Sequence, residues 1–281
     1  PNYDGFIPDL VKLGLPIVRK METYDDNVDN VKWFNLSGYP LDQRLLKTSD
    51  WEDWQEQVNF IQSQLTDEEI ETAFKALPEA VQDETIEDIK AHLKARRDNL
   101  GDIAQRYYNY LQEFQVLPGT EEDDVFNIER KENGITAIEM INEDGKQVFS
   151  KSYNSEATNE IWIYGLDGDD TFKVTGDGEN LIRINVIGGE ENDIYDFENT
   201  RKIKLYDHKS KENTITNPKS KKWLVDDYEI NTYDPDKRKQ SENKIMPQVD
   251  YNGDEGLSLG LKDTYTTYGL TNNPFNTQHR F

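Results

Sequence analysis

Cysteine is absent from the 281 residues, and histidine occurs only three times. A chain without thiols forms no disulfide, offers no thiolate to zinc and has no cysteine nucleophile. Long apolar runs are also missing, since none approaches the roughly 18 residues that a membrane-spanning helix needs, and no secretory leader is recognisable. Because the chain starts at Pro1 without a methionine, we expect it to be a segment of a longer polypeptide.

Positive charge is scarce, with 32 Lys and Arg against 56 Asp and Glu and a formal net charge of −24 at pH 7. Such a surface repels phosphate backbones, and no stripe of basic and aromatic residues is present, so we expect no nucleic-acid partner. Cations are the natural counter-partners, although an acidic surface also serves solubility alone. Despite a mean hydropathy of −0.90, the aromatic content of 11% favours a folded chain.

Recognisable catalytic motifs are missing as well. The three histidines, His92, His208 and His279, stand outside the D-x-H and G-N-H-(D/E) motifs of binuclear phosphoesterases. The chain has no G-x-S-x-G or G-x-x-x-x-G-K-(S/T) motif, and Gly176-Asp-Gly178 lacks the third glycine of a dinucleotide-binding loop. With 56 acidic residues, a glycosidase-like carboxylate pair is not distinguishable by sequence. We therefore expect no enzyme, and an independent hydrolase is the least favoured alternative.

The first 116 residues divide into two parts. Residues 1–47 mix Gly and Pro with short apolar clusters, which predicts an irregular segment packed on something else. Residues 48–116 form a helical subdomain: Ser49 with Glu52 reads as a capping box, and Thr66 with Glu69 opens a second helix. Two more helices are expected, one after Thr85 and one after residues 99–101.

A motif of the form G-x-x-x-x-D-x-(F/Y) recurs from residue 117 onward. It occupies residues 119–127, 165–173 and 188–196, with starts 46 and 23 residues apart. Because 46 is twice 23, a unit is expected midway, and residues 142–150 keep the aromatic Phe149 in its place. Alternating strands begin four residues before three of the turns, at Ile138, Ile161 and Ile184, and Ile203 starts a weaker fifth.

Such short strand–turn–strand units do not bury an apolar face alone, so neighbours must stack on one another. The expected fold class is therefore α+β, with an N-terminal helical subdomain followed by a short β-solenoid-like array of about 23 residues per rung. The array spans residues 117–216, with Ile, Val and aromatic residues inward and the acidic turns along one edge.

The turns resemble the hemolysin-type (RTX) calcium-binding nonapeptide G-G-x-G-x-D-x-U-x. Stacked acidic turns would bring like charges together, and calcium, which takes six to eight oxygen ligands, would bridge them. The alternative is an edge of solvated turns, and it is favoured slightly because glutamates, such as Glu191, stand where calcium rolls prefer glycine. The candidate calcium ligands are Asp124, Asp167, Asp169, Asp170 and Asp193. No other cofactor is expected.

The carboxyl end is polar before it becomes regular. Residues 217–256 read as a linker with some docking through Trp223, whereas residues 257–281 alternate apolar with small or polar residues. That alternation is typical of the start of an outer-membrane β-barrel and equally of a half-buried soluble strand.

The order of these elements resembles the middle of bacterial envelope proteins in which a calcineurin-like metallophosphoesterase precedes the segment and a BamA-type surface-antigen barrel follows it. The resemblance covers roughly residues 40–281 and implies a linking module with no catalytic role of its own. It implies an outer-membrane location, on the periplasmic or the surface side, with the adjacent domains as partners and membrane contact only through the C-terminal segment. The residues that carry it are ARRDNLG at 95–101, Tyr107-Tyr108, GTEEDDVF at 119–126, YGLDGDDTF at 164–172, IGGEEND at 187–193 and NPFNTQHRF at 273–281.

Three functions follow in order of preference. The first is a non-catalytic structural and positioning module between an enzyme domain and a barrel. The second is a calcium-stabilised adhesion or protein-binding module. The third is the independent hydrolase, for which the motifs are missing.

Overall fold

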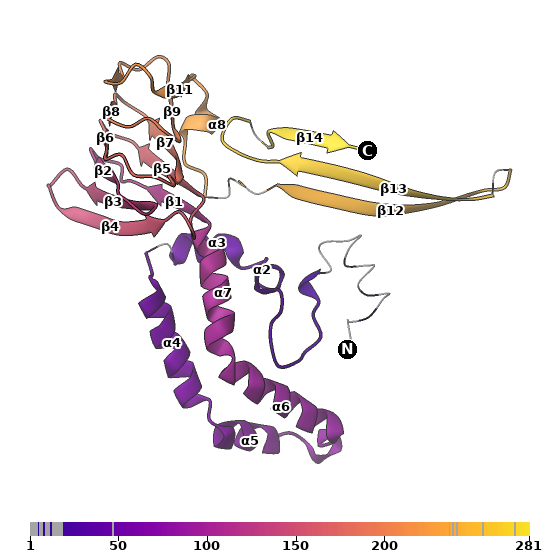
Figure 1. The fold of residues 1–281 in the computed structure, drawn as a ribbon. Helices are drawn as coiled ribbons and strands as arrows, with labels where there is room; N and C mark the ends of the chain where they lie inside the picture. Colours follow the sequence, from indigo (N-terminus) through magenta and orange to yellow (C-terminus); the bar gives the residue numbers. More distant parts are fainter. Residues whose placement is uncertain are drawn as a thin grey trace.

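The computed structural model describes residues 5, 8, 12, 19–46, 48–235, 237, 239, 241–254, 256–272 and 274–281, except for the side chain of Asp250. The fold is mixed α+β, with helices in the N-terminal part followed by strands in three sheets (Figure 1). This agrees with the expected class. Most of the segment predicted to be irregular over residues 1–18 lies outside the described residues.

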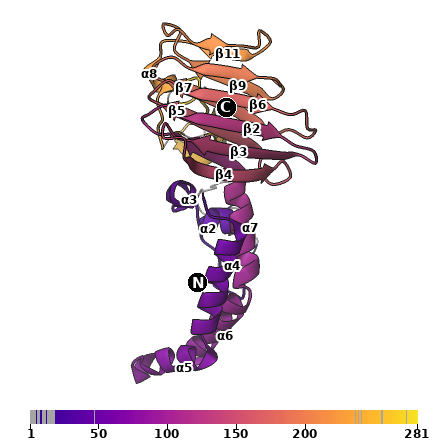
Figure 2. The same cartoon turned by 90° about the vertical axis from the view of Figure 1, so that its left-hand side faces the viewer.

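The helices form an arm that extends away from the strands (Figures 1 and 2). The core of the arm lies where α7 packs against the segment that precedes α4, through Val28, Val31, Tyr39, Tyr107 and Tyr110. Its helical elements are α2 (Val31–Phe34), α3 (Tyr39–Leu45), α4 (Trp51–Gln64), α5 (Asp67–Lys75), the 3-10 turn η2 (Glu79–Val81), α6 (Glu84–Asp98) and α7 (Leu100–Gln112).

The helix starts are set by side-chain caps. The capping box of α4 is formed by Asp50 and Asp53, one residue after the predicted Ser49 and Glu52 pair. The Thr66 hydroxyl accepts from the Glu69 N–H at the start of α5, as predicted. Ser49 instead accepts from the indole of Trp54, so its oxygen is already used.

Two sheets stack their strands side by side in the same register. The first is parallel throughout, and the second is parallel from β2 to β10. The first sheet has the order β1 (Phe114–Pro118), β5 (Glu160–Leu166), β7 (Arg183–Gly189), β9 (Ile203–Asp207), β11 (Lys221–Leu224). The second has the order β10 (Thr214–Ile215), β8 (Ile194–Phe197), β6 (Thr171–Thr175), β2 (Val125–Arg130), β3 (Ile135–Ile141), β4 (Gln147–Asn154).

Each repeat unit consists of a strand of the first sheet, a turn and a strand of the second. The units are β1–β2, β5–β6, β7–β8 and β9–β10, called units one to four. Apolar side chains of both sheets meet between them, and Ile163, Val186 and Leu205 are fully buried. Burying one such side chain contributes about 1.5–3 kcal/mol, so this core holds the units together.

The unit predicted at residues 142–150 is wrong. Strand β3 pairs antiparallel with both β2 and β4, so residues 135–154 form an inserted hairpin that extends the second sheet. Asn142 makes the tight turn: its carbonyl accepts from the Gly145 N–H at 2.9 Å, and Gly145 has φ 73°. The 46-residue step between units one and two therefore contains one repeat and one insertion.

The 23-residue period also applies less widely than predicted. It separates units two and three, where Glu160 pairs with Arg183 and Thr171 with Ile194. The next pairings join Ile184 with Ile203, 19 residues apart, and Lys204 with Lys221, 17 apart. Later turns are shorter, so the repeat length falls along the chain.

The region expected to be a linker contains ordered elements. Strand β11 is the edge of the first sheet, and α8 (Tyr228–Asn231) packs beside it. A long hairpin of β12 (Glu242–Asn252) and β13 (Gly256–Thr267), joined by β14 (Thr277–Arg280), then projects from the body (Figure 1). Of the helices described, none combines the length and apolarity that a bilayer crossing requires.

Candidate functional site

The predicted acidic residues lie in the turns that join the two sheets within each unit. Parallel pairing aligns Val125, Thr171, Ile194 and Thr214, the first residues of the second-sheet strands. The residues immediately before them are therefore stacked at one edge. These are Asp124, Asp170, Asp193 and Asn213, here called the inner ladder.

The inner ladder is a chain of side-chain to backbone hydrogen bonds. The N–H of Asp124 donates to Oδ1 of Asp170 at 2.8 Å, and the N–H of Asp170 donates to Oδ1 of Asp193 at 2.9 Å. The N–H of Asp193 donates to Oδ1 of Asn213 at 2.8 Å. The three aspartates are at most 1% exposed, so each bond satisfies a backbone donor that water does not reach.

A second row of bonds runs one residue earlier in the same turns. Here the N–H of Asp169 donates to Asp123 at 2.8 Å, that of Asn192 to Asp169 at 3.0 Å, and that of Glu212 to Asn192 at 2.9 Å. The donors of this outer ladder point back to the preceding unit, whereas those of the inner ladder point to the next unit. Neighbouring turns are thus tied in both directions.

The motif glycines make room for the inner carboxylates. A Cβ added to Gly165 would lie 1.9 Å from Asp170 Oδ2, and one added to Gly188 would lie 2.0 Å from Asp193 Oδ2. The equivalent distance at Gly119 to Asp124 Oδ2 is 2.8 Å. The spacing G-x-x-x-x-D therefore reflects a side chain that occupies the space left by its own unit's glycine.

The aromatic position of the motif forms a third column. The rings of Phe126 and Phe172 stack at 5.1 Å between centroids, and those of Phe172 and Tyr195 at 5.3 Å. All three are buried. Every defined position of the motif thus makes a contact between or within units.

Burial changes the protonation of the inner ladder. It raises the pKa of Asp170 to about 8, with nearby carboxylates adding to the effect and the hydrogen bond from Asp124 opposing it. Burial, together with the charge of Asp207, raises the pKa of Asp193 to about 9. Asp170 Oδ2 accepts no hydrogen bond, so a proton on this oxygen lowers the cost of burying the carboxyl group.

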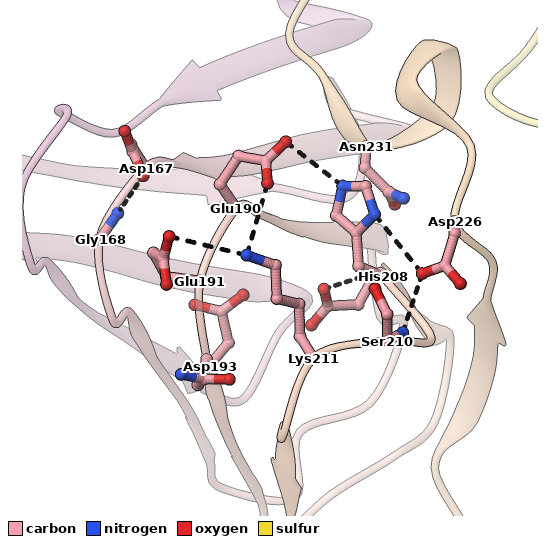
Figure 3. A network of polar contacts seen from close by, with 12 residues as sticks. Asp167, Gly168, Glu190, Glu191, Asp193, His208, Ser210, Lys211, Asp226 and Asn231 are labelled. Atoms are coloured by element: carbon pink, nitrogen blue, oxygen red, sulfur yellow. Dashed lines mark hydrogen bonds and ion pairs between the residues drawn. The ribbon is translucent and has the colours of Figure 1, made fainter.

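The ladder ends in a polar network at units three and four (Figure 3). The buried Tyr195 hydroxyl donates to Asp207 Oδ2 at 2.7 Å and lies 3.4 Å from Asp193 Oδ2. Burial raises the pKa of Asp207 too. The His208 ring lies between two carboxylates, with Nε2 3.5 Å from Glu190 and Nδ1 3.8 Å from Asp226. This network joins the two turns to the loop after β11.

The five predicted calcium ligands are not used alike. Asp124, Asp170 and Asp193 are brought together in the inner ladder, as the stacking of turns implied. Asp169 belongs to the outer ladder, and the exposed Asp167 accepts only from the N–H of Gly168. Among the residues described, no cluster of three or more His, Cys, Asp or Glu is arranged to hold a metal ion.

Two members of the site were missed by the sequence reasoning. Asn213 precedes Thr214 and Ile215, so it follows the D-x-(F/Y) spacing with each residue replaced, a signal that was available. Asp207 follows Tyr206, the pairing partner of Ile187, and so takes the place that Gly188 has in unit three. A carboxylate at a glycine position carries no recognisable signal.

Comparison with known proteins adds no assignment. No family model matches the chain, and neither a curated protein nor a solved structure matches it.

The inner ladder gives the protein a distinctive pH dependence. Because Asp170 and Asp193 have raised pKa values in the folded state, that state binds more protons than the unfolded chain between about pH 4 and pH 8. The free energy of unfolding should therefore fall as the pH rises through this range, by at most about 1.4 kcal/mol per pH unit for each carboxyl group. Urea unfolding at pH 5 and pH 8 measures this.

The variant Asp170→Asn tests the assignment, because Asn keeps Oδ1 for the Asp124 N–H and removes the titrating group. It should be more stable than the parent at pH 8 and show a shallower pH slope. Asp167→Asn is the matched control, since this exposed residue lies in the same turn. Equal slopes for the parent and Asp170→Asn would contradict the assignment.

Proposed function

We propose that this chain is a non-catalytic structural and positioning module of a larger bacterial envelope protein, and that its repeat units form a short β-solenoid. The observation that carries the proposal is the use of the motif itself. The Gly165 position gives space, Asp170 accepts a backbone N–H from unit one, and Phe172 stacks on two neighbours. Residues that recur along the chain thus act between units, as in a stacked array.

The solenoid proposal is supported by the pairing pattern. Parallel strands follow one another in register in both sheets, with each unit next to its sequence neighbours. The inserted β3–β4 hairpin covers one end of the second sheet. A stack of this kind is stiff because each unit is held by hydrogen bonds and ring contacts from both sides.

The C-terminal hairpin supports a membrane-proximal position. Leu257, Leu259 and Leu261 alternate along β13 on one face, and they are 64%, 74% and 72% exposed. Their pairing partners on β12 include Tyr251 and Val249, which are also exposed. An apolar face of this size is unusual on a free surface and fits a strand pair that continues into an outer-membrane barrel. The module would then connect a preceding enzyme domain to that barrel.

Small-angle scattering combined with a phosphoesterase assay tests the proposal. A compact chain of this length would have a radius of gyration of about 19 Å. A stiff spacer should exceed about 25 Å, and the chain should not turn over p-nitrophenyl phosphate with magnesium, manganese or zinc. A radius near 19 Å, or metal-dependent turnover that purifies with the chain, would contradict a positioning role.

A calcium-stabilised adhesion module is the second candidate, and one observation favours it. Asp124 Oδ1 and Asp170 Oδ2 are buried without a hydrogen-bond partner, and a cation would satisfy both as a proton does. Calorimetric titration of calcium into chelator-treated protein should then show heat and a raised melting temperature. No heat and no shift would leave the first proposal.

A further inference from the structure

A groove of about 420 Å³ lies on the outer face of the first sheet. Strands β5, β7, β9 and β11 form its floor, and the segment between β13 and β14 contributes a wall through Tyr268, Leu270 and Asn276. The volume falls in the range of small-molecule sites. None of the residues of the inner ladder lines it.

The charge of this groove is opposite to that of the whole chain. Its lining contains five basic residues and a single carboxylate, whereas the protein carries a formal charge of −24. The carboxylate is Glu160, whose side chain is 6% exposed and 3.0 Å from Arg183 and 3.1 Å from Lys239. Glu160 also accepts from the Trp162 indole and the Asn185 amide. It is therefore saturated and balances only two of the cations.

Two of the remaining lysines are placed side by side. Lys204 of β9 pairs in register with Lys221 of β11, so their backbones are roughly 4.8 Å apart and their side chains share one face. Among the residues described, neither lies within ion-pair distance of a carboxylate. Lys204 Nζ is held over the rings of Tyr206, at 4.5 Å, and Trp223, at 4.9 Å.

Like charges on directly opposed residues destabilise a sheet unless something compensates them. A third lysine, Lys202, lies in the same groove and donates to the Leu181 carbonyl at 2.8 Å, which fixes its ammonium group. Several ammonium groups held in a recess by rings and a carbonyl are suited to an oxyanion with more than one negative charge. The aromatic and amide groups beside them, Trp162 and Asn185, suit a polar organic body.

We propose that this groove binds the phosphate group of a small phosphate monoester, with Lys204 and Lys221 as its principal contacts. This site is independent of the positioning role, which it neither requires nor excludes. Lysines on an edge strand such as β11 also discourage sheet-to-sheet aggregation, and that role is the competing explanation.

Calorimetric titration of the full chain with inorganic phosphate, glucose 6-phosphate and glucose tests the site. We expect saturable binding of both phosphates, tighter for the ester, none for glucose, and weaker binding at high salt. The double variant Lys204→Gln/Lys221→Gln should lower the affinity at least tenfold, and Lys204→Arg/Lys221→Arg should retain it. Lys173→Gln, on the exposed face of β6 in the other sheet, is the matched control and should bind as the parent does.

The proposal is overturned by any of three results. Binding of glucose as tight as that of its phosphate would remove the role of the anion. Equal affinities for the double variant and Lys173→Gln would place binding elsewhere. No binding of either phosphate at millimolar concentration, with all variants folded by circular dichroism, would leave the lysines as protection of the sheet edge.

Discussion

Replacing Gly165 with alanine is expected to lower the free energy of unfolding by at least about 3 kcal/mol, or to prevent the strand region from folding. The added methyl group would lie 1.9 Å from Asp170 Oδ2 and 2.3 Å from the Gly188 carbonyl oxygen. The carboxyl group is held by the Asp124 N–H and the carbonyl is part of the neighbouring strand, so neither moves without breaking the stack. Urea unfolding followed by tryptophan fluorescence measures the loss.

Gly253→Ala is the control for this experiment. Gly253 lies near the tip of the β12–β13 hairpin, and a Cβ added there meets no atom within 4 Å. This variant should change the free energy of unfolding by less than about 0.5 kcal/mol. A similar loss for both variants would mean that the effect comes from the flexibility of glycine in the unfolded chain and not from the packing of the turn.

The helices were predictable because their signals are local. Acidic or hydroxyl caps and apolar spacing lie within a few residues of one another, so α4 to α7 follow from the sequence alone. The one-residue error at α4 arose because Ser49 and Asp50 are both capable caps, and the indole of Trp54 engages Ser49. That contact depends on packing, which no local pattern reports.

The strand array was predictable in its composition but not in its connections. Ile138 and Met140 alternate like the strands of the first sheet, yet they lie in β3 and pair antiparallel with β2. The inserted hairpin happens to match the repeat in length, so counting residues could not separate the two. Strand direction is decided by the turn at Asn142 and Gly145, which closes too tightly for a unit that crosses between sheets.

The candidate site shows a different limit. A carboxylate in a stacked turn can accept a backbone N–H or hold a cation, and both uses require the same residue at the same spacing. Only the positions of neighbouring backbones distinguish them. The structure supplies an N–H within 3 Å of Oδ1 of Asp170 and of Asp193, which explains the recurrence of the aspartates without a ligand.

The second large effect is expected for Phe172→Ala, which should cost about 3–5 kcal/mol. Phe172 is fully buried and lies in the middle of the aromatic column, between Phe126 and Tyr195. Its removal therefore leaves a cavity and breaks two ring contacts at once. Phe126 has one such stacking partner in the column, so Phe126→Ala should cost less if the stack itself contributes.

Two further variants separate packing from stacking. Phe172→Leu retains much of the volume but not the ring, so a loss well below that of Phe172→Ala would assign most of the effect to the cavity. Phe60→Ala is the surface control, because Phe60 is 59% exposed on α4 and should change stability by less than about 1 kcal/mol. If Phe172→Ala and Phe60→Ala unfold at the same urea concentration, the column does not hold the units together. A loss confined to Phe172→Ala and Phe126→Ala, with the helical signal unchanged before the transition, would place the stabilising contacts between units, where the parallel stack requires them.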